Sequence, residues 1–183
     1  MTTANKITLA RLVMVPVFIV LALLDFPGHK LAALIVFVIA GASDSLDGYI
    51  ARHYNQVTDF GKFADPLADK ILIISALLLF VQWGQMPAWC AILIVMREFA
   101  VTGLRLIAVE NGLVIAAAMA GKLKTFFSTI GCCIMLTPLK DATLFGVSAL
   151  SLNNICVAVM VVLTVWSGCE YFVKNAHVLA NTK

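Results

Sequence analysis

Charged residues are scarce in this 183-residue chain. Its 13 lysines and arginines and 10 acidic residues make up 13% of the sequence, about half of the roughly 25% typical of soluble globular domains. Hydrophobic residues reach 62%, and the mean hydropathy is +0.99. Long apolar runs at this frequency are typical of a polytopic membrane protein. The runs are continuous rather than alternating, so we expect them to form transmembrane helices.

Several other features are missing. No CxxC pair or metal-ligand spacing occurs among the five cysteines, Cys90, Cys132, Cys133, Cys156 and Cys169. We therefore expect the cysteines to be small apolar packing residues. No internal repeat or soluble segment is evident, which favours a single domain over residues 1–183. No small-x-small cleavage site follows the first apolar run, so we expect that run to be retained as a span.

Six apolar runs approach the ~20 residues that a helix needs to cross the hydrocarbon core of a bilayer. The predicted spans are residues 7–24, 31–51, 66–81, 87–109, 123–139 and 144–172. Turn and helix-stop signals separate several of them, in the segments DFPGHK, WGQMP, ENG and TPLKD. The sequence thus predicts an all-α polytopic membrane protein with six transmembrane helices.

The distribution of lysine and arginine predicts the orientation of these spans. With six spans, both termini lie on the same side of the membrane. That side holds Lys6, Arg11, Arg52, Lys62, Lys70, Arg97, Arg105, Lys122, Lys124, Lys174 and Lys183, whereas the other side holds Lys30 and Lys140. Because positive residues accumulate on the cytoplasmic side, we expect both termini to be cytoplasmic.

Five of the ten acidic residues fall within residues 43–70, across the end of the second span and the start of the third. Asp44 and Asp47 share one helix face, and so do Asp65 and Asp69. Four carboxylates that converge near a membrane interface would repel one another unless cations neutralised them. Oxygen ligands select Mg²⁺ or Mn²⁺, and zinc is disfavoured because no histidine or cysteine stands nearby at zinc-ligand spacing. We expect Asp59 to be a helix cap or a solvated charge.

Residues between these two carboxylate pairs suit a phosphate-bearing substrate. Gly48 and Gly61 would let a ligand approach the backbone closely. Ala51 keeps one turn of the helix face small, and Arg52 offers a guanidinium fork to phosphate oxygens. Together with the predicted cations, these residues describe a diphosphate pocket.

The full pattern, Asp44-x2-Asp47-Gly48-x2-Ala51-Arg52-x8-Gly61-x3-Asp65-x3-Asp69, resembles the signature of the CDP-alcohol phosphotransferase family. The resemblance implies a six-span bundle, usually homodimeric, with two divalent cations and a CDP-linked alcohol in a cytoplasmic cavity. It implies metal binding by the four aspartates, catalytic roles for Asp69 (the general base) and Asp65, and CDP binding by Asp47, Gly48, Ala51, Arg52 and Gly61.

A second polar region, MREFAVTGLRLIAVENG followed by GKLKT, carries Arg97, Arg105, Lys122 and Lys124. Four cations beside the metal cavity favour an anionic acceptor, most simply a phosphate. Alternatively, these side chains extend to the membrane interface and only determine topology. Glu98 either pairs with one of the arginines or contacts the cytidine or a hydroxyl group.

With the N-terminal NKITLARL, this region resembles the phosphatidylglycerophosphate synthase branch of the family. That resemblance implies transfer of a phosphatidyl group from CDP-diacylglycerol to sn-glycerol 3-phosphate, with release of CMP. Two alternatives remain. One is the same chemistry with inositol phosphate or phosphatidylglycerol as the acceptor. The other is an ion-coupled transporter, which would spread its acidic residues through the bilayer and break its helices in paired halves.

Overall fold

The chain forms a bundle of helices. The computed structural model describes residues 3–53, 59–110, 112–113, 119–143, 151–176 and 178, without the side chains of residues 3–6, 44–53, 59–66, 69 and 110. Its helices are α1 (Thr3–Leu23), α2 (His29–His53), α3 (Asp59–Gln82), α4 (Ala88–Glu110), α5 (Met119–Met135), the 3-10 helix η1 (Pro138–Asp141) and α6 (Leu152–Lys174). Within the described ranges there is no β-strand, only an isolated bridge between Thr143 and Ser151.

Two helices end at glycines in the left-handed region of backbone conformation. Gly84 (φ +68°) follows α3, and Gly112 (φ +70°) follows α4. After α3, the amide of Gln85 donates to the carbonyl of Phe80 and that of Gly84 to Val81, which is a Schellman motif. Leu113 and Gly112 repeat this pattern after α4. These are the positions where WGQMP and ENG predict helix stops.

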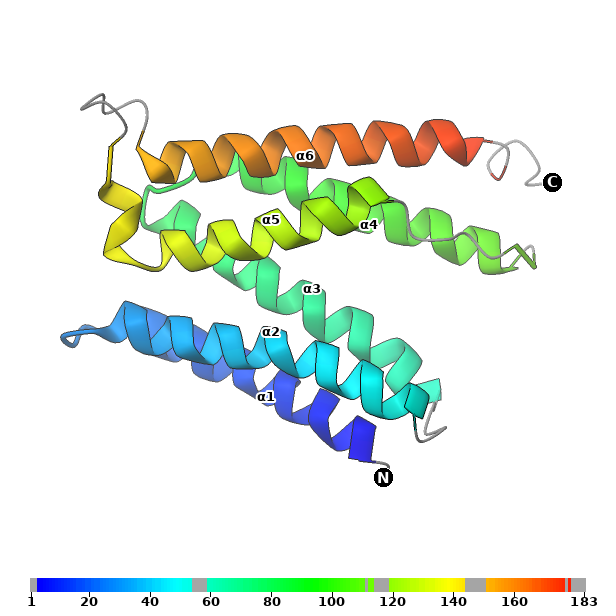
Figure 1. Ribbon diagram of the computed structural model, residues 1–183, viewed down its shortest axis with the longest axis horizontal. Helices are drawn as coiled ribbons and strands as arrows, with labels where there is room; N and C mark the ends of the chain where they lie inside the picture. The colour runs from blue at the N-terminus through cyan, green and yellow to red at the C-terminus, as the bar shows by residue number, and fades with distance from the viewer. Residues whose placement is uncertain are drawn as a thin grey trace.

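The helices form two groups that α3 connects (Figure 1). One group contains α1 and α2, which pack along each other and against α3; the other contains α4, α5 and α6. The start of α1, the end of α2, the start of α3 and the ends of α4 and α6 lie toward the right in Figure 1. We call this the site end of the bundle. The α1–α2 and α3–α4 connections lie at the opposite end.

Apolar side chains fill the space between the helices. Phe18 of α1 and Phe37 of α2 are fully buried, with ring centroids 5.6 Å apart. Buried alanines on α1 and α2, among them Ala22 and Ala33, let the two backbones approach closely. A second, smaller cluster joins α4 to the end of α6 and includes the buried Tyr171.

The lengths of the apolar helices test the predicted spans in part. Among the described residues, α6 is the one helix both long and apolar enough to cross a membrane. Shorter apolar helical stretches are Ile7–Leu23, His29–Ser43 and Lys70–Gln82. The sixth predicted span starts at residue 144, whereas α6 starts at Leu152 and residues 144–150 lie outside the description. The number of spans and their orientation stay predictions.

Candidate active site

The two aspartate pairs lie on consecutive helices at the site end of the bundle. Asp44 and Asp47 belong to the last part of α2, and Asp65 and Asp69 to the first part of α3. Figure 1 shows these two helix ends meeting at that end. The side chains of all four lie outside the description, as do those of the predicted nucleotide residues Gly48, Ala51, Arg52 and Gly61. Among the described side chains, no three histidine, cysteine or acidic residues gather as a metal site.

The donor set of these two helix ends fits a hard divalent cation. It consists of four carboxylates carried on two helices, and the segment 43–70 that holds them contains no cysteine and a single histidine, His53, at the end of α2. Carboxylate oxygens are the ligands that Mg²⁺ and Mn²⁺ prefer. Without a cation, four negative charges in an otherwise apolar chain would be costly.

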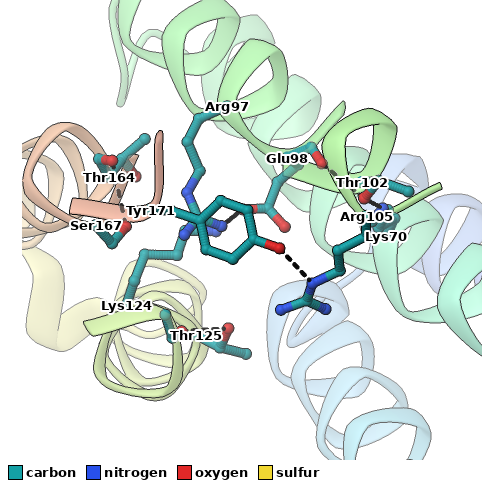
Figure 2. A network of polar contacts seen from close by, with 11 residues as sticks. Lys70, Arg97, Glu98, Thr102, Arg105, Lys124, Thr125, Thr164, Ser167 and Tyr171 are labelled. Carbon is teal, nitrogen blue, oxygen red and sulfur yellow. Dashed lines mark hydrogen bonds and ion pairs between the residues drawn. The ribbon is translucent and has the colours of Figure 1, made fainter. Parts of the chain in front are cut away.

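A cavity of about 700 Å³ opens beside Lys70 of α3. It is lined by residues of α3, α4, α5 and α6: Lys70, Arg97, Glu98, Val101, Thr102, Arg105, Leu106, Val109, Gly121, Lys122, Thr125, Phe126 and Tyr171. Three of the four predicted acceptor residues, Arg97, Arg105 and Lys122, line it. Figure 2 shows several of these side chains converging from their helices. With Lys70, the lining holds four cations and one carboxylate, so the cavity carries a net positive charge.

Glu98 joins two of the predicted cations. Its Oε1 accepts from Arg97 Nη1 at 3.0 Å and from Lys124 Nζ at 2.8 Å. The Lys124 side chain is only 4% exposed, so its ammonium is almost fully removed from solvent. Burial of a charge is tolerated when the charge is paired, and Glu98 is that partner. The pairing with an arginine, one of the two alternatives from the sequence, is therefore the one that the structure shows.

Lys124 faces a different space from the other three predicted acceptor residues. It lines a small cavity of about 20 Å³ together with Lys70, Glu98 and Ser128. That volume suffices for a single water molecule. Lys124 thus reaches the large cavity through Glu98, its shared ion-pair partner, and not by direct contact.

Lys70 connects α3, which carries Asp65 and Asp69, to α4. Its ammonium donates to the hydroxyl of Thr102, and that hydroxyl donates to the carbonyl of Glu98 at 2.8 Å. Lys70 directly follows Asp69 in α3 and lines both cavities. The positively charged cavity therefore adjoins the helical turn that carries the last aspartate of the predicted metal site.

Arg105 is held by α6. Its Nε donates to the hydroxyl of Tyr171 at 3.2 Å, and its guanidinium lies 5.6 Å from the centroid of the Tyr171 ring. Tyr171 is 2% exposed, so this support is fixed by the packing of α6 on α4. The arrangement directs an otherwise exposed arginine over the cavity (Figure 2).

Sequence reasoning did not assign Lys70, Thr102 or Tyr171 to the site. A signal existed for Lys70, because a lysine at the start of an apolar run marks a functional position more often than a packing one. Thr102 and Tyr171 carry no such signal. Their roles come from the α3–α4 and α4–α6 contacts, which the sequence does not display.

The Glu98 ion pairs allow a stability prediction. We expect Glu98→Gln to lower the midpoint of thermal unfolding in detergent by about 5 °C, since loss of one partner leaves the buried Lys124 charge uncompensated, at a cost of about 2 kcal/mol. Glu170→Gln is the matched control, because Glu170 pairs with an exposed lysine, Lys174. Its midpoint should change by less than about 1 °C. Equal shifts in the two variants would contradict the role given to Glu98.

Comparison with known proteins identifies the family. The family model described as CDP-alcohol phosphatidyltransferase matches residues 1–166. A Bacillus subtilis protein named CDP-diacylglycerol–glycerol-3-phosphate 3-phosphatidyltransferase is 44% identical, over 96% of this chain and 95% of its own length. A probable phosphatidylglycerophosphate synthase of Mycobacterium tuberculosis is 42% identical, over 93% of this chain and 80% of its own. A Rickettsia bellii protein with the same name as the Bacillus one is 31% identical, over 92% of each chain. The chain belongs to the CDP-alcohol phosphatidyltransferase family.

Proposed function

We propose that this protein transfers a phosphatidyl group from CDP-diacylglycerol to sn-glycerol 3-phosphate, forming phosphatidylglycerophosphate and CMP. The relatives from Bacillus, Mycobacterium and Rickettsia carry names for this activity. The observation that carries the proposal is the cavity lined by Lys70, Arg97, Arg105 and Lys122. The cavity lies next to α3, which carries Asp65 and Asp69, and its positive lining suits an acceptor with a negative charge.

The acceptor phosphate would bind the cations of the cavity. Arg97 and Arg105 can each offer a planar fork of N–H donors to phosphate oxygens, and Lys122 adds a mobile positive charge. Lys124 would not contact the acceptor itself but would influence Arg97, because both side chains pair with Glu98. An acceptor without a phosphate, such as zwitterionic serine or a cationic amino alcohol, would leave this positive lining uncompensated.

The aspartate helices would bind the donor. Asp44, Asp47, Asp65 and Asp69 would hold two divalent cations, Mg²⁺ or Mn²⁺. When bound, such ions neutralise the diphosphate and increase the electrophilicity of its phosphorus. Asp47, Gly48, Ala51, Arg52 and Gly61 would contact the CDP moiety.

In the reaction, the acceptor hydroxyl oxygen forms a bond to the β-phosphorus of CDP-diacylglycerol. The bond from that phosphorus to the bridging oxygen breaks, and CMP leaves with the electron pair. Asp69 would take the hydroxyl proton as general base, with Asp65 in the catalytic set beside it. Asp69 immediately precedes Lys70, which lines the acceptor cavity, so the base and the acceptor would be neighbours.

The protein would work as a single membrane domain of residues 1–183. Six spans are proposed, with the site end and both termini cytoplasmic and two copies forming a homodimer. Large apolar side chains exposed on α4 and α6, such as Ile92, Met96 and Val162, support a lipid-facing surface. A site end at the membrane surface would let the diacylglycerol chains stay in the inner leaflet while the polar groups react.

Competition between acceptors tests the choice of substrate. Purified protein receives CDP-diacylglycerol with equal concentrations of glycerol 3-phosphate, inositol phosphate and phosphatidylglycerol, and the lipid products are identified by mass spectrometry. We expect phosphatidylglycerophosphate to be the dominant product. Predominance of an inositol lipid or cardiolipin would retain the transferase chemistry and reject glycerol 3-phosphate as the acceptor.

The acceptor cavity also makes a kinetic prediction. We expect Arg105→Ala to raise the KM for glycerol 3-phosphate at least about tenfold, the usual effect of losing a charge-assisted hydrogen bond. The KM for CDP-diacylglycerol should change by less than about twofold. Lys174→Ala is the control, since it removes one positive charge from the same end of the bundle without touching the cavity. A similar rise in both variants would indicate a general effect of charge.

A further inference from the structure

The Arg97 side chain passes close to two glycines, Gly168 of α6 and Gly121 of α5. A Cβ atom added to Gly168 of α6 would lie 3.3 Å from Arg97 Cγ. A Cβ atom added to Gly121 of α5 would lie 3.7 Å from Arg97 Nη2. We call the space beside Gly121 and Gly168 the glycine slot. The stem of Arg97 thus lies beside Gly168, and its guanidinium lies beside Gly121.

Few polar contacts fix Arg97 in the slot. Among the described residues, its Nη1 donates to Glu98 Oε1 at 3.0 Å. Its Nε is buried and finds no hydrogen-bond partner among the described residues. Thr164, one turn before Gly168 on α6, is fully buried and its hydroxyl also finds no partner there. The direction of the Arg97 side chain thus depends on the shape of the slot as well as on Glu98.

We propose that Gly168 is a positioning residue, which keeps the Arg97 guanidinium at the acceptor cavity by leaving space for its aliphatic stem. This inference rests on the proposed function, in which Arg97 binds the acceptor anion. Carbon atoms in ordinary contact are about 3.5–4.0 Å apart, so a methyl group on Gly168 would crowd Arg97 Cγ. Because α6 is packed against α4 and α5, the flexible arginine would move more readily than the helix.

The test compares alanine substitutions at two helix contacts that both involve α6, one with α4 and one with α5. Gly168→Ala would place its methyl against Arg97, whereas Gly131→Ala of α5 would place one 3.4 Å from Met160 Sδ of α6. We expect Gly168→Ala to raise the KM for glycerol 3-phosphate about tenfold, as weakening of one charge-assisted hydrogen bond does. The KM for CDP-diacylglycerol should stay within about twofold of wild type. Gly131→Ala should leave both constants within about twofold. Equal effects of the two substitutions on the acceptor KM would overturn the proposal.

A double-mutant cycle ties the effect to Arg97. In an Arg97→Ala background the slot is empty, so Gly168→Ala should produce no further change in the acceptor KM. The midpoint of thermal unfolding in detergent is measured for the same single and double variants as a second readout. If Gly168→Ala alone does not fold, the double variant should recover folded protein, because the methyl then has space. A penalty that persists without the arginine side chain, in either readout, would refute the role of Gly168.

Failure of the proposed function gives a different result. If the wild-type protein uses another anionic acceptor, glycerol 3-phosphate is ruled out as its substrate. The Gly168→Ala and Gly131→Ala variants would then be compared by their KM for that other acceptor. If the wild type transfers to no acceptor, the proposed function fails and the unfolding cycle still decides whether Gly168 acts on Arg97.

Discussion

Asp69→Asn is expected to lower the rate of phosphatidyl transfer by about 10³-fold or more, since loss of a general base alone typically costs 10²–10⁴-fold. Asparagine has nearly the same shape as aspartate but cannot take the proton of the acceptor hydroxyl. It also removes one of the four negative charges proposed to bind the cations. CMP release from CDP-diacylglycerol in the presence of glycerol 3-phosphate measures the loss.

Two further variants show whether the loss is specific. Asp44→Ala on α2 should abolish transfer as well, because it removes a proposed metal ligand. Asp59→Asn is the matched control: Asp59 begins α3 and lies within the same acidic segment, yet the sequence predicts a cap or solvated charge there. Its rate should stay within about twofold of wild type, and all three proteins should elute as folded species. Full activity of Asp69→Asn would contradict the base assignment.

Removal of divalent cations should have an effect of similar size. After dialysis against a chelator, we expect transfer to fall at least about 100-fold, since the cation contributes several kcal/mol of transition-state stabilisation. Mg²⁺ or Mn²⁺ should each restore activity, because both suit an all-carboxylate donor set. Full activity in the chelated protein would contradict the metal-dependent mechanism.

A second readout of the same prediction does not depend on turnover. Ions that bind the folded protein stabilise it, so titration of Mg²⁺ into the chelated protein should raise the midpoint of thermal unfolding. In Asp44→Ala the rise should be absent or need much higher ion concentrations. An equal rise in that variant would place the bound ion elsewhere.

The order and approximate limits of the helices could be predicted because the apolar runs are continuous and several end at recognisable stops. The fourth predicted span, residues 87–109, corresponds to α4 (Ala88–Glu110), which ends at the Gly112 turn. The sixth predicted span, residues 144–172, overlaps α6 (Leu152–Lys174), and its first seven residues lie outside the described part of the chain. The N-cap of α6 is Ser151, whose side chain accepts from the amide of Asn154.

The basic cavity could be predicted only as a group of charges. Arg97, Arg105 and Lys122 stood out because cations are rare in this chain, and the structure brings them to one cavity. The sequence did not distinguish Lys124, whose ammonium is buried against Glu98. Whether Lys124 faces the cavity or Glu98 depends on how α5 packs beside α4, and the sequence alone does not show that packing.

The supporting residues could not be predicted because they are ordinary in the sequence. Tyr171 lies 66 positions from Arg105, which it contacts, and Lys70 lies 32 positions from Thr102. Gly168 is one glycine among 11, and nothing local marks it as the wall of the glycine slot. Such roles arise from contacts between helices and become visible only when the helices are assembled.

The most direct test of the account is CMP release by the purified protein in detergent, with CDP-diacylglycerol and one candidate acceptor at a time. We predict release that requires both glycerol 3-phosphate and either Mg²⁺ or Mn²⁺. Absence of release with every acceptor and both ions, from protein shown to be folded, would contradict the central claim that the aspartate helices and the basic cavity form one transferase site.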